Sequence, residues 1–77
     1  MRSIKDIAQE IQLDWTNVYF GASPYLEAMH SLNKVTDNYG QDGADSIVLY
    51  FLSNASSWKG DNARRIKTEL KNMLKRG

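Results

Sequence analysis

The chain has 77 residues, a formal net charge of +1, one histidine and no cysteine. This length predicts one domain over residues 1–77 with room for one small core, and the absence of cysteine excludes disulfides and thiolate metal sites. The N-terminus has no apolar segment typical of a secretory signal, and no run approaches the roughly 20 apolar residues of a membrane span. We therefore expect a cytoplasmic protein that does not associate with a membrane.

A first helix is predicted from Ser3, which suits an N-cap, with Asp6 adding a negative charge in the first turn. Leu13 lies off the apolar face, so the helix should end near Leu13, or Leu13 should pack on a different neighbour. Residues 14–22 mix turn formers with aromatics and indicate a loop, with an isolated strand at residues 18–20 as the alternative. The apolar face consists of Ile4, Ile7, Ala8, Ile11 and Trp15.

Ser23 and Pro24 are a strong start signal for a second helix, with serine at the cap and proline at the first helical position. Residues 36–43 are rich in turn formers and predict the connection to the next helix. The apolar stripe of the second helix consists of Tyr25, Ala28, Met29, Leu32 and Val35.

Residues 44–58 contain the longest apolar run of the chain, residues 47–52. The run favours a strand by propensity, but a helical period that holds for about four turns favours a helix. Leu49 and Tyr50 lie off the main face, so this helix is apolar most of the way round and should be buried among several neighbours. Asp42 can cap its start and Gly60 suits its end. The main face consists of Ala44, Ile47, Val48, Phe51, Leu52, Ala55 and Trp58.

A last helix follows from Asp61. Its buried face is predicted to consist of Ala63, Ile66, Leu70, Met73 and Leu74. The four predicted helices are too short for a regular coiled coil. The fold class is therefore all-α, a compact irregular bundle of four short helices in which the third is the most buried.

Charge is unevenly placed along the chain. Residues 1–57 carry three cations and seven carboxylates, whereas residues 58–77 carry seven cations and two carboxylates. Arg64, Lys67, Lys71 and Lys75 recur at helical spacing along the last helix, with Arg65 and Arg76 on the other flank. This basic stripe has two interpretations: a solvated face, or a contact surface for phosphates or for an acidic protein.

The aromatic residues Trp15, Tyr19, Phe20 and Tyr39 fall at helix ends or in loops. They can close the ends of the core. Alternatively, they form an exposed aromatic patch, which would mark a protein-binding site.

The sequence shows no constellation for catalysis. His30 lies just off the stripe of the second helix, beside Leu26, and no nucleophile motif accompanies it. Asp42 and Asp45 fall at a helix start, and their segment departs from the ligand spacing of a calcium loop. We therefore expect no catalytic residue, no metal site and no cofactor.

Three motifs carry a resemblance: DW-x-N at residues 14–17, A-x-PYL-x-AM at residues 22–29, and YFLSNASSWKGDNARRIK-x-EL at residues 50–70. Together they resemble a group of small proteins carried by phages, plasmids and conjugative elements of Gram-positive bacteria. The resemblance implies a cytoplasmic accessory protein, and small proteins of such elements often bind and block a host factor, including restriction and CRISPR nucleases.

The expected function is accordingly that of a non-enzymatic, macromolecule-binding accessory protein whose partner is a protein, such as a host defence protein. The alternative is a small nucleic-acid-binding protein that uses the basic last helix. The sequence leaves the oligomeric state open.

Overall fold

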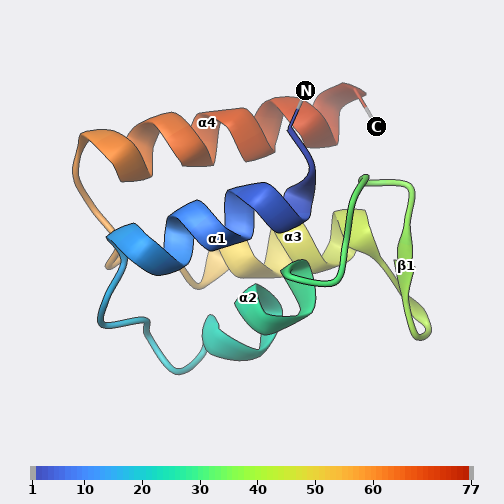
Figure 1. Cartoon of the computed structure of the whole chain (residues 1–77), viewed down its shortest axis with the longest axis horizontal. Helices are drawn as coiled ribbons and strands as arrows, with labels where there is room; N and C mark the ends of the chain where they lie inside the picture. The colour runs from blue at the N-terminus through green and yellow to red at the C-terminus, as the bar shows by residue number, and fades with distance from the viewer. Residues whose placement is uncertain (1, 77) are drawn as a thin grey trace.

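Four helices and one short hairpin make up the computed structural model, which describes residues 2–76 (Figure 1). The helices are α1 (Ile4–Asp14), α2 (Ser23–Met29), α3 (Ala44–Ser53) and α4 (Asp61–Arg76). The hairpin pairs β1 (Asn38–Tyr39) with β2 (Asp42–Gly43) in antiparallel register. In Figure 1, α4 lies along the top, α1 lies in front of α3, and α2 lies at the bottom. The prediction of an irregular bundle of four short helices is confirmed, and the hairpin is an addition that the sequence did not predict.

The start of α1 is fixed by acceptors for its free backbone N–H groups. As predicted, Ser3 is the N-cap, and its hydroxyl accepts a hydrogen bond from the amide of Asp6 at 3.2 Å. The amides of Ile4 and Lys5 donate to the carbonyls of Asn33 and Leu32, at 2.9 and 2.8 Å. The first turn of a helix leaves such donors without partners. The segment that follows α2 supplies them here, which ties it to α1.

The region from α1 to α2 departs from the prediction in detail. The helix ends at Asp14, as expected, but Leu13 is strongly exposed, so the alternative that it packs on another neighbour is wrong. Residues 18–19 are irregular and Phe20 begins a turn, so the alternative of a strand at residues 18–20 is wrong. Ala22, not Ser23, is the N-cap of α2, and α2 ends at Met29. Leu32 is still buried, but it packs from the loop after the helix.

The hairpin turns at Gly40, which has a φ of 63°. A two-residue turn with positive φ at its first position favours glycine there, because glycine has no Cβ to clash. Asp42 pairs in β2 and does not cap α3, whose N-cap is Gly43 without a side-chain bond. The prediction of an Asp42 cap is therefore wrong.

The end of α3 comes earlier than the helical period suggested, at Ser53 and not near Trp58. The hydroxyl of Ser53 donates to the carbonyl of Leu49 at 3.0 Å, and the side-chain amide of Asn54 donates to the carbonyl of Tyr50 at 2.9 Å. Side chains that bond to the last carbonyls compete with further helical turns. Gly60, with a φ of 116°, turns the chain into α4 and does not end α3.

One hydrophobic cluster takes side chains from all four helices. At one end of it the Trp15 and Trp58 rings stack at 5.7 Å, and Phe51 meets both rings edge-on at 6.1 and 6.4 Å. However, α3 is not enclosed on all sides, because Leu49 and Tyr50 are 54% and 50% exposed. The prediction that its off-face residues are buried is wrong. The other three short helices cover only the main face of α3.

Candidate functional site

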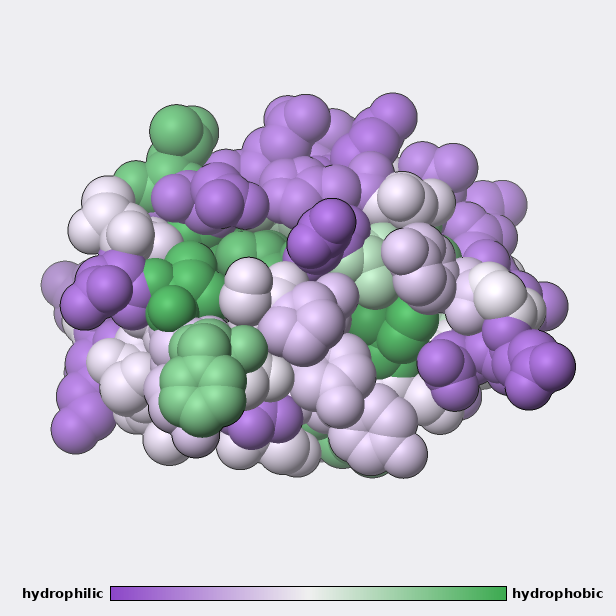
Figure 2. Space-filling view, turned by 90° about the horizontal axis from the view of Figure 1, so that it is seen from below, coloured by the Kyte–Doolittle hydropathy of each residue, from purple (hydrophilic) through white to green (hydrophobic). Residues whose placement is uncertain are grey.

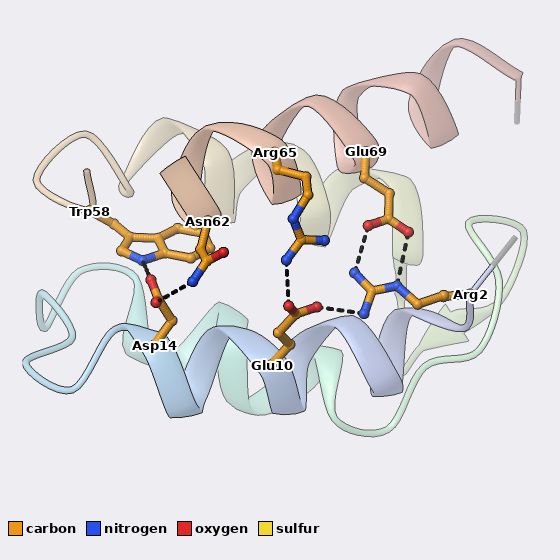
Figure 3. Close-up of polar contacts among 7 residues, drawn as sticks. All are labelled: Arg2, Glu10, Asp14, Trp58, Asn62, Arg65 and Glu69. Atoms are coloured by element: carbon orange, nitrogen blue, oxygen red, sulfur yellow. Dashed lines mark hydrogen bonds and ion pairs between the residues drawn. The ribbon is translucent and has the colours of Figure 1, made fainter. Parts of the chain in front are cut away.

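The seam between α1 and α4 holds a network of ion pairs (Figure 3). The guanidinium of Arg2 donates to both carboxylate oxygens of Glu69, at 3.1 and 2.6 Å, and to Glu10 at 2.5 Å. Arg65 donates to the other oxygen of Glu10 at 2.5 Å. Hydrogen bonds from Arg2, then from Arg65, lower the pKa of Glu10, and Arg2 likewise lowers the pKa of Glu69. These charges join the two helices.

Asp14 connects the same two helices at the other end of the seam. Its carboxylate accepts hydrogen bonds from the indole nitrogen of Trp58 at 2.8 Å and from the amide nitrogen of Asn62 at 3.0 Å (Figure 3). The bond from Asn62, then that from Trp58, lowers the pKa of Asp14. Trp15 is only 7% exposed. The structure therefore removes Trp15 from the predicted exposed aromatic patch, because it stacks on Trp58 inside the core.

The structure divides the basic residues of α4 into two groups. Arg65 pairs with Glu10. The ammonium of Lys67 donates to the Trp58 carbonyl at 2.6 Å and lies 5.7 Å from the centre of the Trp58 ring. Both side chains therefore serve the fold. The side chains of Arg64, Lys71 and Lys75 are exposed, and that of Arg64 lies 3.9 Å from Asp61. The side chain of Arg76 lies outside the described residues.

The remaining predicted aromatics do not form one patch. Tyr19 and Phe20 lie together in the loop between α1 and α2, with ring centres 4.8 Å apart, and Phe20 is 80% exposed. Tyr39 is in the hairpin, at the opposite end of the molecule (Figure 1). Two separate aromatic sites therefore replace the predicted group of four.

The outward side of α3 carries the apolar surface that the sequence analysis missed. Leu49 and Tyr50 are both half-exposed there, and the Tyr50 ring lies 5.5 Å from that of Tyr25 on α2. The sequence signal for this surface is that α3 is apolar most of the way round, a pattern that also predicts burial. We call Tyr25, Leu49 and Tyr50 the α3 surface.

The α1–α2 loop lies near one end of α3, and a groove separates the α3 surface from α4. Gly21, next to the Tyr19–Phe20 pair, approaches Asn54 so closely that a Cβ there would lie 3.0 Å from its side-chain oxygen. Toward α4, a shallow groove of about 490 Å³ begins at Leu49 and is lined by Leu52, Leu74, Lys71 and Lys75, among others. The α1–α2 loop thus approaches the end of α3 at Asn54, and the groove extends from Leu49 to α4.

Figure 2 shows the face on the side of α2, seen from below. Hydrophobic groups reach this face in several separate places between polar ones, including its left end, where Figure 1 places the α1–α2 loop. Near this loop, Leu13 and Phe20 are strongly exposed. Apolar exposure is therefore not confined to α3.

His30 borders a hollow of about 260 Å³ that Ser23 and Glu27 also line. Its Nε2 hydrogen-bonds to the side-chain oxygen of Gln12 at 3.0 Å. Within residues 2–76, no three His, Asp or Glu side chains lie close enough together to hold a metal ion. Over the same range, no helix is both long and apolar enough to cross a membrane.

Comparisons with protein-family models, with curated proteins and with solved structures found no match to this chain. The resemblance to proteins of mobile elements therefore stays a prediction. Two of its motifs meet in the structure, since Asp14 from the first contacts Trp58 and Asn62 from the third.

Proposed function

We propose that this protein acts by binding another protein through the α3 surface and has no active site of its own. The observation that carries the proposal is the half-exposure of Leu49 and Tyr50 within the longest apolar run of the chain. Each Å² of apolar area removed from water contributes roughly 25 cal/mol. A partner that covers this helix would gain that contribution, and contiguous exposed apolar surface often marks such an interface.

The chemistry of the α3 surface also suits a protein partner. Tyrosine combines a large apolar ring with a polar tip, and it is enriched at protein interfaces and their energetic centres. The rings of Tyr25 and Tyr50 lie side by side with centres 5.5 Å apart, so each restricts the rotamers of the other and lowers the entropy cost of binding.

Nucleic-acid binding through α4 has less support. Affinity for a phosphate backbone grows with the number of cations that contact it. Of the five predicted contact residues, Arg65 and Lys67 are engaged within the fold. The remaining three span more than two turns of α4, which leaves too sparse a row for strong binding.

The resemblance supports a more specific proposal about context. In this proposal the protein is a cytoplasmic accessory factor of a mobile genetic element, and its partner is a host protein such as a defence nuclease. Blocking a host protein requires only a surface that occupies the target.

Photo-crosslinking in a Gram-positive host tests the proposal. A benzophenone amino acid replaces Tyr50, and a matched variant carries it in place of Gln9, which is exposed on α1. The expected result is a discrete protein adduct from position 50 that survives nuclease treatment and is absent from position 9. Equal labelling from both positions, or adducts that nuclease removes, would contradict the proposal.

A further inference from the structure

We propose that the groove between α3 and α4 receives an acidic amphipathic helix of the partner protein. This inference rests on the proposed function, because it names the chemistry of the segment that would extend from the α3 surface into the groove. The apolar floor and the two lysines along its edge carry the argument.

Leucines give the groove an apolar floor, and Ser53, Thr68 and Asn72 complete its lining. Leu49 and Leu52 contribute from α3, and Leu74 contributes from α4. The groove is shallow, with a volume of about 490 Å³, and most of its exposed lining is apolar. An open groove of this kind fits the side chains on one face of a helix better than it fits an enclosed small molecule.

The edge of the groove is positively charged. Lys71 and Lys75 are four residues apart on α4, so they lie on one side of it with a rise of about 6 Å between them. Within residues 2–76, neither ammonium has a carboxylate within ion-pairing distance, whereas Arg2 and Arg65 on the seam are both paired. The two lysines are therefore free to pair with a ligand.

Other cations nearby strengthen the positive electrostatic potential at the edge of the groove. Lys67 lies one turn before Lys71, and burial first, then the charges of Lys71 and Lys59, lower its pKa. The positive charges at this part of α4 thus repel one another. A ligand that brings carboxylates would relieve the repulsion and steer its own approach.

The combination of floor and edge selects the ligand. A helix with apolar residues three or four apart fits the leucines, and acidic residues at the same spacing beside them fit the lysines. A nucleic acid could use the lysines but would leave the leucines uncovered. A second copy of this chain could cover the leucines, but within residues 2–76 none of its helices presents two free carboxylates four residues apart. Asp6 on α1 is followed four residues later by Glu10, which is already paired, and the exposed Glu27 is the one carboxylate on α2.

Fluorescence anisotropy with designed peptides tests the inference. The probe is a short labelled helical peptide with leucines three and four residues apart and glutamates beside them. A control peptide carries lysine in place of every glutamate. We expect the glutamate peptide to bind on the order of tenfold more tightly or better, since two ion pairs and the loss of two repulsions separate the peptides.

Matched protein variants locate the site. The double variant Lys71→Glu/Lys75→Glu should weaken binding of the glutamate peptide by about tenfold or more, and Leu49→Ser should weaken it by several-fold. The control Lys5→Glu/Lys34→Glu makes the same change in net charge at exposed positions that do not line the groove. It should keep the affinity within about twofold, and circular dichroism melts should show that all variants remain folded.

Several outcomes would overturn the inference. They are equal binding of the two peptides, an equal loss in the control variant, displacement of the peptide by duplex DNA, and self-association that Leu49→Ser abolishes without any peptide binding. A position-50 protein adduct with no peptide binding would reject the acidic helix but leave the proposed function standing. Failure of both experiments would reject both.

Discussion

The two flanks of α4 differ in one respect: on one flank the charges are paired, and on the other they are not. Toward α1, Arg65 and Glu69 join the network with Arg2 and Glu10. Toward α3, Lys71 and Lys75 border an apolar groove, and neither forms an ion pair within residues 2–76. One helix therefore holds the fold together with one flank and offers an incomplete surface with the other. Counting cations along the sequence would treat the two flanks as equal.

The largest effect should come from the core that lies beneath both flanks. Phe51 is fully buried against the edges of the stacked Trp15 and Trp58 rings, so Phe51→Ala should lower the free energy of unfolding by roughly 3–5 kcal/mol. In a domain of this size that loss would leave much of the protein unfolded. Urea unfolding followed by circular dichroism measures it. A cooperative transition close to that of the wild type would show that Phe51 does not anchor the core.

The next effect should come from the paired flank. Arg2→Met removes the residue that binds both Glu10 and Glu69, while methionine keeps much of the apolar stem. We expect a loss of about 1 kcal/mol, the upper range for partly exposed pairs, because the network shares one guanidinium. Lys5→Met makes the same type of change at an exposed site and should change stability far less. Equal effects in the two variants would contradict a structural role for the seam.

Acid should weaken the paired flank selectively. The folded-state pKa values of Glu10 and Glu69 are lowered by Arg2, so the stability that these carboxylates contribute is present above their unfolded pKa values. It is lost as the pH falls from the usual glutamate range through the lower folded values. The urea midpoint should therefore fall in acid more steeply for the wild type than for Arg2→Met. Parallel pH profiles would show that the network does not act through these charges.

A variant of His30 tests whether this histidine has a functional role, as it would in an enzyme. His30→Ala removes the hydrogen bond to Gln12, so a loss of up to about 1 kcal/mol is expected. The yield of the protein adduct at position 50 should stay within about twofold of the parent. A strong loss of adduct or of biological activity at unchanged stability would point to the hollow beside α2, and would reopen the case for an enzyme.

Local features of the fold were predictable from the sequence. Ser3 indicated the start of α1, because a cap depends only on residues three apart, and the helical period placed Phe51 in the core. The end of α3 was not predictable by period, because Ala55 and Trp58 continue the pattern while Ser53 and Asn54 bond to the last carbonyls. A helical period shows which side chains are buried, and Ala55 and Trp58 are buried although they lie beyond the end of the helix.

The candidate site was less predictable because it depends on long-range register. Arg65 and Glu10 are 55 residues apart in the chain, and no local pattern shows that they meet. By sequence Trp15 is an aromatic residue at a helix end, and only the fold shows that it stacks on Trp58. The apolar circumference of α3 indicated burial, but a pattern cannot say how many neighbours the fold supplies. Leu49 and Tyr50 remain exposed for that reason.

The smallest effect on stability should come from the unpaired flank. Lys71→Gln/Lys75→Gln removes two charges that have no partner among the described residues, so the free energy of unfolding should stay within about 0.5 kcal/mol of the wild type. Removing the repulsion between Lys71 and Lys67 acts in the stabilising direction. Urea unfolding of this variant beside Arg2→Met measures the comparison directly. A loss as large as that of Arg2→Met would mean that the lysines serve the fold, and the two flanks of α4 would then be alike.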